Sequence, residues 1–197
     1  MKKSWVFLLV FSLFFSAAPN SAQANNLSIW EKLEGSSPNG YVLLLRHSIA
    51  PGSGDPENFK LGDCSTQRNL SQQGREQAKR IGEWIKQTEI EIFRIESSRW
   101  CRARDTAELM GLGKVRLNRS LDSLFGKSNI ARHPNTLKIK EQIINHRKKP
   151  GLLILVGHFV NIAAITGVGV NSGTGVLVRA NSRGKIEVVG STPNFDQ

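Results

Sequence analysis

The sequence predicts a three-layer α/β/α sandwich with a mostly parallel central sheet. Short apolar runs alternate with amphipathic stretches along most of the chain, a pattern typical of successive strand and helix units. The runs at residues 41–45 and 152–156 are continuously apolar, as expected of parallel strands that are buried on both faces. A histidine follows each of these runs within two residues. Because ligands bind at the carboxyl edge of such sheets, a functional site is expected there.

Each element follows from a local pattern. Predicted strands are short apolar runs bounded by charge, glycine or proline, and predicted helices place apolar residues on one face, the first two after a capping serine. The predicted strands lie at residues 41–45, 92–95, 115–117, 152–156, 176–180 and 185–189. The predicted helices run from Ser71 to Gln87, from Ser97 or Ser98 to Gly111, and from about Pro134 to His146. Residues 50–69 are expected to form a loop, and residues 181–184 a hairpin turn.

The amino-terminal residues have the three parts of a secretory signal. Lys2 and Lys3 precede an apolar run over residues 5–15, and small residues ending in Ala22-Gln23-Ala24 follow it. The apolar run is shorter than the ~20 residues that span a bilayer, which argues against a membrane anchor. We therefore predict a signal peptide over residues 1–24, a periplasmic or secreted protein without stable membrane insertion, and a single domain over residues 25–197.

The formal net charge of +11 favours anionic partners. Basic residues are scattered apart from a short run at residues 147–149, and the chain has neither zinc-finger spacing nor an aromatic RNA-binding signature. A solvated basic face explains this composition most simply. Anionic substrates or envelope surfaces come next, and nucleic acid is the partner class that the pattern favours least.

The chain contains two cysteines, Cys64 and Cys101. Thiols commonly pair in an oxidising compartment, so we predict a disulfide between them. Two buried thiols or one reactive thiol are the alternatives, because sequence alone does not give the geometry that a bridge requires.

Three predicted strands converge on chemistry suited to an anion. Arg46-His47 follows the strand at 41–45, and His158 follows the strand at 152–156. A third strand leads into the helix that carries Arg102 near its start, where backbone N–H groups and the helix dipole favour negative charge. This convergence predicts a phosphate-binding cradle.

These motifs resemble the histidine phosphatase superfamily, the phosphoglycerate-mutase-like phosphatases. Its opening Arg-His motif is matched by Leu45-Arg46-His47-Ser48, and its Ser-Ser, Arg-Ala and Thr-Ala motif by residues 97–107. Residues 69–78 resemble the start of the family's first helix, and Val156-Gly157-His158 its closing motif. Any one match is weak, but four in the correct order are specific. Residues 50–70 further resemble a signal-bearing bacterial branch of that superfamily.

The resemblance implies a mechanism in which His47, as a neutral imidazole, attacks phosphorus and forms a phosphohistidine. Arg46 and Arg102 would bind the phosphoryl oxygens, and His158 would add positive character as charge develops on them. Only four histidines are present, without a tight pair at metal-ligand spacing, so the pattern implies no metal and no other cofactor.

A carboxyl group must still protonate the leaving oxygen and then activate water. The resemblance favours Asp122, because the family's glutamate lies in a corresponding region after the second helix. Asp55 and Asp63, on the loop after His47, are the alternatives. Other branches place an aspartate directly after the second histidine, but Phe159 occupies that position here.

Some residues depart from the family pattern or carry no assigned role. Ser48 stands where glycine is usual, and Ser53 and Asn58 are the only candidates for the family's phosphate-contacting asparagine. His133 and His146 lie in a polar, basic segment and are expected to be structural. The role of Arg68 is left open, and Trp100 is expected to be near the core or at the pocket border.

The resemblance predicts an exported, metal-independent phosphomonoesterase that acts on a small-molecule or glycan phosphate ester. A phosphorylated envelope sugar, such as lipopolysaccharide core heptose phosphate, is the most concrete substrate. A mutase is disfavoured because mutases of this superfamily serve cytoplasmic glycolysis. The alternative is a non-catalytic protein that binds phosphate or an anionic polymer on the same fold. A basic adaptor that acts by charge alone ranks last, and the oligomeric state is not predicted.

Overall fold

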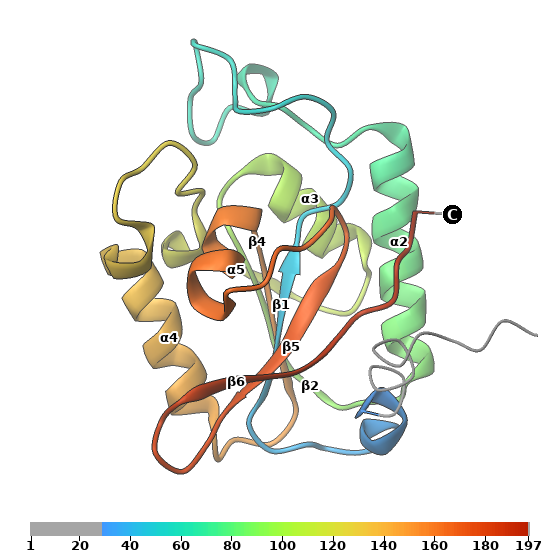
Figure 1. The fold of residues 1–197 in the computed structure, drawn as a ribbon. Helices are drawn as coiled ribbons and strands as arrows, with labels where there is room; N and C mark the ends of the chain where they lie inside the picture. The colour runs from blue at the N-terminus through green and yellow to red at the C-terminus, as the bar shows by residue number, and fades with distance from the viewer. Residues whose placement is uncertain (1–28, 197) are drawn as a thin grey trace, which may run out of the picture.

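The computed structural model describes residues 29–196, so the predicted signal peptide lies outside the described residues. Figure 1 shows three layers, with a central sheet between two layers of helices. Helices α2 (Gln72–Gln87) and α3 (Cys101–Leu109) cover one face, and α4 (Pro134–His146) and α5 (Phe159–Thr166) cover the other. The predicted layer order is confirmed. Within residues 29–196, no helix has the length and apolar character needed to cross a bilayer.

The sheet contains six strands in the order β3-β2-β4-β1-β5-β6. Their bounds are β1 Tyr41–Arg46, β2 Ile92–Ser97, β3 Val115–Leu117, β4 Leu152–Gly157, β5 Gly175–Ala180 and β6 Ile186–Ser191. Strands β3, β2, β4 and β1 are parallel to one another, whereas β5 runs antiparallel to both β1 and β6. The sheet is therefore mixed but mostly parallel, and the predicted carboxyl-terminal hairpin is present.

Strand β1 is buried on both faces because it lies inside the sheet, between the two helical layers. Leu43 and Leu45 belong to the core beneath α2 and α3, while Val42 and Leu44 belong to the core beneath α4 and α5. All four side chains are essentially inaccessible to solvent. Full burial of such side chains contributes roughly 1.5–3 kcal/mol each. This alternation explains why the run is apolar at every position and why it ends abruptly at Arg46.

The two predicted serine caps have different outcomes. Ser71 caps α2 as predicted, because its hydroxyl accepts a hydrogen bond from the Gly74 N–H at 3.0 Å. Helix α3, however, begins at Cys101 with Trp100 at the cap position, so the predicted cap at Ser97 or Ser98 is wrong by two or three residues. Ser98 instead accepts a hydrogen bond from the Trp100 N–H at 3.2 Å. Ser97 is thereby the last residue of β2, and Ser98 follows it with its hydroxyl near His158.

Helix α5 and three short 3₁₀ helices are absent from the sequence prediction. The 3₁₀ helices span Cys64–Thr66 (η1), Arg119–Leu121 (η2) and Ile130–Arg132 (η3). Helix α5 is short and almost wholly apolar, so it lacks the alternation of polar and apolar faces that identifies a surface helix. It starts directly after His158 and lies beside the carboxyl end of the sheet (Figure 1).

Candidate active site

The parallel pairing of β1 and β4 brings the two predicted histidines together. Arg46 pairs with Gly157 in the sheet, so His47 and His158 leave the same edge at the same level. Their ring centroids are 5.5 Å apart, with an angle of 64° between the ring planes. Both histidines, together with Arg46 and Arg102, line one pocket of about 390 Å³. The four residues of the predicted cradle therefore meet in space.

His47 is held as a neutral imidazole with one ring nitrogen unengaged. It is 2% exposed, and its Nδ1 lies 2.8 Å from the Ser48 carbonyl oxygen. A carbonyl only accepts, so Nδ1 carries the proton and Nε2 carries the lone pair. Burial lowers the pKa of His47 to about 3, and the charges of Arg102, Arg46 and Arg68 add to this effect against the opposing Ser48 bond. At neutral pH, Nε2 is available as a nucleophile.

His158 is also neutral in the free protein. Its Nε2 lies 2.9 Å from the Ser98 hydroxyl, at the end of β2. Burial first, then His47 and the neighbouring arginines, hold the pKa of His158 well below its usual value. The positive character expected of His158 is therefore absent before an anion enters. A bound phosphate dianion would favour its protonated form, because opposite charge raises the pKa of an imidazole.

Arg46 and Arg102 reach the pocket from different elements. Arg46, the last residue of β1, donates from Nη1 to the Val170 carbonyl at 3.0 Å. Arg102, in the first turn of α3, forms a fork with Asp55: Nη1 lies 2.7 Å from Oδ1 and Nη2 lies 3.2 Å from Oδ2. Asp55 thus occupies, in the free protein, a guanidinium that was predicted to bind phosphate.

Arg68 is a third pocket arginine, and its role was left open by the sequence. Its Nε donates to the Gly54 carbonyl at 2.7 Å, and its Nη1 donates to the Ala50 carbonyl. These bonds fold residues 50–68 over the carboxyl edge of the sheet. Burial and the charge of Arg102 lower the pKa of both Arg46 and Arg68. Such shifts are expected where cations gather without enough anions.

The charge of the pocket matches a phosphate monoester. The ionisable groups that line it are three arginines, one aspartate and two neutral histidines. The net charge of the lining is therefore two positive charges. A phosphate monoester dianion carries two negative charges, which the net charge of this lining can balance with protein side chains alone.

Of the three carboxylates proposed as the proton donor, only Asp55 lines the pocket. Its Oδ2 accepts from the Trp100 indole N–H at 3.0 Å, and its Oδ1 accepts from the Arg68 backbone N–H at 3.1 Å. Burial raises its pKa, but the bonds from Arg102 and Trp100, the charge of Arg102 and the Arg68 N–H together lower it below the usual value. Asp55 is therefore an anion in the free protein.

Asp122 and Asp63 are engaged elsewhere. The Asp122 carboxylate is buried and accepts from Arg99 through the backbone N–H at 3.0 Å, through Nε at 2.9 Å and through Nη2. Asp63 is exposed and caps η1 through a bond from the Ser65 N–H at 3.1 Å. Neither residue lines the pocket: Asp122 contacts Arg99 of the middle motif but does not join His47, Arg46, Arg102 and His158 in the pocket lining.

Ser53 and Asn58, the candidates for the family's phosphate-contacting asparagine, differ in their position relative to the pocket. Ser53 lines the pocket between Gly52 and Gly54, whereas Asn58 does not. Ser48 is fully buried, and its backbone N–H donates to the Thr106 hydroxyl at 3.0 Å. That contact fixes the residue after His47 to the helix that carries Arg102.

Cys64 and Cys101 form a disulfide, with their Cα atoms 5.7 Å apart. The bridge joins η1 to the first residue of α3, immediately before Arg102. The Gln67 side chain adds a second link, since its Oε1 accepts from the Cys101 N–H at 3.0 Å. The predicted pairing is therefore present in the structure, and it ties the loop after His47 to the helix that carries Arg102.

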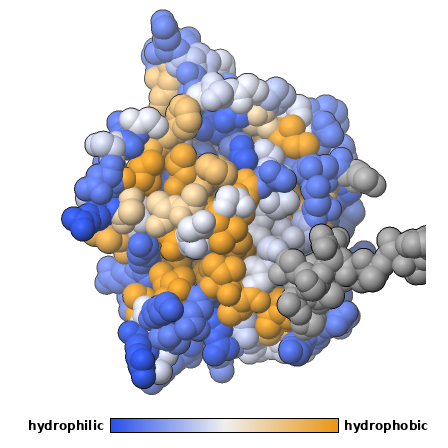
Figure 2. Space-filling model, viewed as in Figure 1, coloured by the Kyte–Doolittle hydropathy of each residue, from blue (hydrophilic) through white to orange (hydrophobic). Residues whose placement is uncertain are grey.

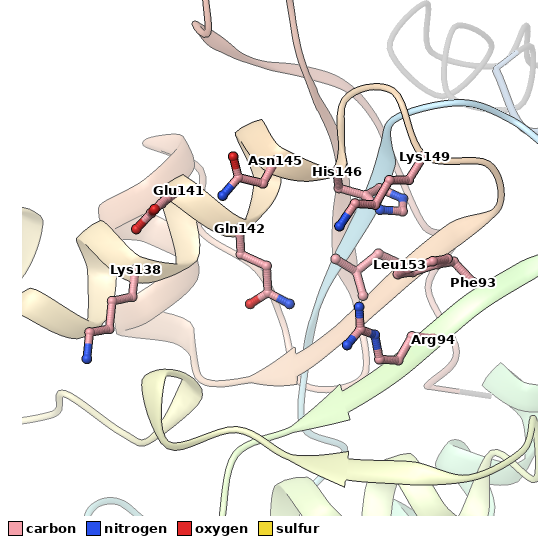
Figure 3. Close-up of a pocket in the computed structure, with 9 residues that line it drawn as sticks. All are labelled: Phe93, Arg94, Lys138, Glu141, Gln142, Asn145, His146, Lys149 and Leu153. Atoms are coloured by element: carbon pink, nitrogen blue, oxygen red, sulfur yellow. The ribbon is translucent and has the colours of Figure 1, made fainter.

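The remaining two histidines have structural contacts. His133 caps α4 through a bond from the Asn135 N–H at 3.2 Å. His146 is buried, with Nε2 2.9 Å from the Gly151 carbonyl oxygen. It borders a second pocket of about 300 Å³ at the amino ends of β2 and β4, where Phe93 and Arg94 face side chains of α4 (Figure 3). None of the motif residues lines that pocket.

Within residues 29–196, no group of three or more His, Cys, Asp or Glu side chains is placed to hold a metal ion.

Comparisons with known proteins support the motif assignment. Residues 42–123, which include His47 and Arg102 but not His158, match the model of the histidine phosphatase superfamily (branch 1). No curated protein gives a significant match to the sequence.

Several solved structures share the fold. The protein histidine phosphatase SixA complexed with tungstate is 14% identical, with a TM-score of 0.57 over 77% of this chain and 96% of that chain. A mutant of phosphoserine phosphatase from Entamoeba histolytica, in complex with phosphoserine, is 15% identical, with a TM-score of 0.58 over 77% and 95%. A mycobacterial glucosyl-3-phosphoglycerate phosphatase in complex with VO3 is 17% identical, with a TM-score of 0.50 over 75% and 96%. At these identities, the likeness establishes the fold alone.

Residues 42–123, from β1 to just beyond η2, are thus similar to branch 1 of the histidine phosphatase superfamily, and the chain has a histidine phosphatase-like α/β fold.

Proposed function

We propose that this protein is an exported phosphomonoesterase that works through a phosphohistidine on His47. The observation that carries the proposal is a neutral His47, with Nε2 unengaged, in a pocket that holds two net positive charges. An imidazole is nucleophilic only while it is unprotonated. Burial, and then the charges of the neighbouring arginines, lower the pKa of His47 and maintain that state, while the same arginines attract the phosphate dianion.

In the first step, the phosphoryl oxygens bind Arg46, Arg102 and Arg68, and Nε2 of His47 attacks phosphorus. The bond from nitrogen to phosphorus forms as the ester P–O bond breaks, and the electron pair of that bond leaves with the ester oxygen. The Nδ1 proton stays in its hydrogen bond to the Ser48 carbonyl. In the second step, water attacks phosphorus and passes a proton to the carboxylate that protonated the ester oxygen, the electron pair of the P–N bond returns to Nε2, and inorganic phosphate leaves a neutral His47.

The ester oxygen needs a proton, and we assign that role to Asp55 rather than Asp122. Asp55 already lines the pocket, whereas Asp122 would first have to leave its bonds to Arg99. Phosphate that binds Arg102 would weaken the hold of this guanidinium on Asp55. The pKa of Asp55 would then rise, which favours proton uptake when substrate is present.

The compartment and the natural substrate are further parts of the proposal. The signal-like residues 1–24 support a periplasmic or secreted protein, and the match of the pocket charge to a dianion supports a monoester. A phosphorylated envelope sugar satisfies both conditions. A non-catalytic phosphate binder on the same fold is the competing proposal, and the bonds that hold Asp55 in the free protein favour it.

The decisive experiment uses residues 25–197 with p-nitrophenyl phosphate in EDTA. We expect turnover in wild type and none in His47→Ala. Rapid quenching of wild type with ³²P-labelled substrate in alkaline denaturant, where phosphohistidine survives, should leave label on His47. His133→Asn, which retains a capping side chain at a residue outside the pocket lining, is the control and should remain active. Label on serine or aspartate would contradict the mechanism, and phosphate binding without turnover would favour the competing proposal.

A further inference from the structure

Two phenyl rings stand exposed at the mouth of the cationic pocket. Phe125 is 61% exposed and Phe159 is 43% exposed, and both line the same pocket as His47. Large apolar side chains at the opening of a polar pocket are typical of ligand-binding sites, where they contact the ligand and a few polar groups orient it. The catalytic steps derived above make no use of either ring.

Each ring is fixed beside a group that belongs to the phosphate site. The Phe159 ring packs against Gly169, where an added Cβ atom would lie 3.3 Å from it. The guanidinium of Arg46 lies 5.6 Å from the centre of the same ring. Phe125 lies next to Gly54, whose carbonyl accepts a bond from Arg68. A phosphate held by these arginines would therefore place its organic group within reach of the rings.

Asn161 joins the two segments that carry the rings. This buried residue of α5 donates from Nδ2 to the Asp122 carbonyl at 2.9 Å and accepts from the Leu124 N–H at 3.2 Å. The segment before Phe125 is thus bonded to the helix that begins with Phe159. Because these bonds fix the backbone segments that carry the two rings relative to each other, the surface between the rings is present before a ligand binds.

The apolar surface extends outward from the pocket. Figure 2, in the view of Figure 1, shows apolar side chains gathered over α5. Val160, in the first turn of α5, also lines the pocket. Besides the arginines, histidines and aspartate already assigned to phosphate binding and proton transfer, the polar side chains among the described residues that line the pocket are those of Ser53 and Ser123.

We infer that Phe125 and Phe159 form the leaving-group subsite, and that it takes a phosphate ester of a ring, through the apolar face of a sugar or an aryl group. This inference rests on the proposed function. A leaving group that carries its own charges, such as an amino acid, would need further charged partners, and the rim offers phenyl rings and hydroxyl groups instead. A flat ring face gains contact on each phenyl group, and the hydroxyls suit the edges of a sugar.

The test measures binding without turnover, by titration calorimetry on the His47→Ala variant. The probes are inorganic phosphate, phenyl phosphate, glucose 1-phosphate, glycerol 1-phosphate and phosphoserine. We expect at least one ring ester to bind roughly 2- to 12-fold more tightly than glycerol 1-phosphate for each phenyl ring engaged. The phenyl and glucose esters distinguish an aryl from a sugar substrate.

Variants then assign the preference to the rings. Phe125→Ser and Phe159→Ser, each added to His47→Ala, should reduce the ratio of ring-ester to glycerol-ester affinity. Leu117→Ser is the matched control, because Leu117 is 57% exposed on β3 and does not line the pocket. It should leave the ratio unchanged. Tight binding of inorganic phosphate with no preference for ring esters would overturn the subsite alone, whereas failure of inorganic phosphate to bind would overturn the proposed function as well.

Discussion

Replacement of Asp55 by asparagine is expected to separate phosphate binding from proton donation. The carboxylate of Asp55 accepts four hydrogen bonds, two from Arg102 at 2.7 and 3.2 Å, one from Trp100 at 3.0 Å and one from the Arg68 N–H at 3.1 Å. Asparagine keeps the shape but loses the charge. Loss of one partner of a buried ion pair costs about 3–5 kcal/mol, and the retained hydrogen bonds should limit the loss to roughly 2 kcal/mol, or about 4–8 °C in Tm.

Arg102 is released in the Asp55→Asn variant, so inorganic phosphate should bind more tightly than in wild type. Turnover of alkyl phosphates should fall by roughly 10²- to 10⁴-fold, because a poor leaving group needs a proton. Turnover of p-nitrophenyl phosphate, whose leaving group is stable as an anion, should fall far less. The measurement is kcat for both esters at 25 °C, below the melting transition of the variant.

Asp122→Asn is the matched comparison, because Asp122 is bonded to Arg99 outside the pocket. It should slow both ester classes to a similar degree. The reasoning is refuted if Asp122→Asn selectively slows alkyl phosphates while Asp55→Asn slows both esters equally. That result would return the proton donor to the position favoured by the family resemblance.

Three further predictions concern stability. Burial lowers the pKa of His47 to about 3, whereas the unfolded chain titrates near 6.5, so the unfolded state takes up the proton first and stability falls as pH drops from about 7 toward 3. Denaturant unfolding of His47→Gln should show a smaller fall over that window, and an equal fall would contradict the assignment. The buried Ser48 hydroxyl has no hydrogen-bond partner in the described structure, so Ser48→Ala should raise Tm by roughly 2–4 °C, and a lower Tm would refute this. The bridge between Cys64 and Cys101 spans a sequence separation of 37 and should contribute roughly 4 kcal/mol. Mass spectrometry of unreduced, periplasm-expressed protein should show one joined peptide, and an unchanged Tm under reductant would remove its stabilising role.

The sequence predicts best the elements whose hydrophobic pattern directly indicates how they are buried. Strands β1 and β4 are buried on both faces, and their continuous apolar runs show this directly. The histidines then follow from the rule that sites form at the carboxyl edge. Helix α5 is not predicted because its residues are apolar on nearly every side, so no polar face distinguishes it as a surface helix. Several of its side chains are nevertheless partly exposed beside the pocket.

The carboxylate cannot be chosen from sequence in the same way. Asp55 and Arg102 are bonded although they lie 47 residues apart in the sequence. The local sequence patterns predict only that Asp55 lies in a loop and that Arg102 lies near the start of a helix. Asp122 has the better position in the motif order, but its bonds to Arg99, 23 residues away, show only in three dimensions. Arg68 and Phe125 become candidates for the same reason, because their roles depend on how loops fold over the sheet.

The loop after His47 and the start of α3 behave as one unit in this fold. The disulfide joins Cys64 to Cys101, Asp55 forks onto Arg102, and the Ser48 N–H bonds to Thr106, so three separate contacts connect the same two segments. A change in any of them should move Asp55 relative to the Arg102 guanidinium, which we propose binds phosphate. We therefore expect proton donation and phosphate binding to be coupled through the loop. The segments that carry the two phenyl rings are joined to each other by Asn161, which takes part in none of these three contacts, although Phe125 also lies next to Gly54 of the loop. Substitutions at the rings should therefore mainly alter which ester is preferred, and substitutions in the loop should mainly alter how fast any ester is cleaved.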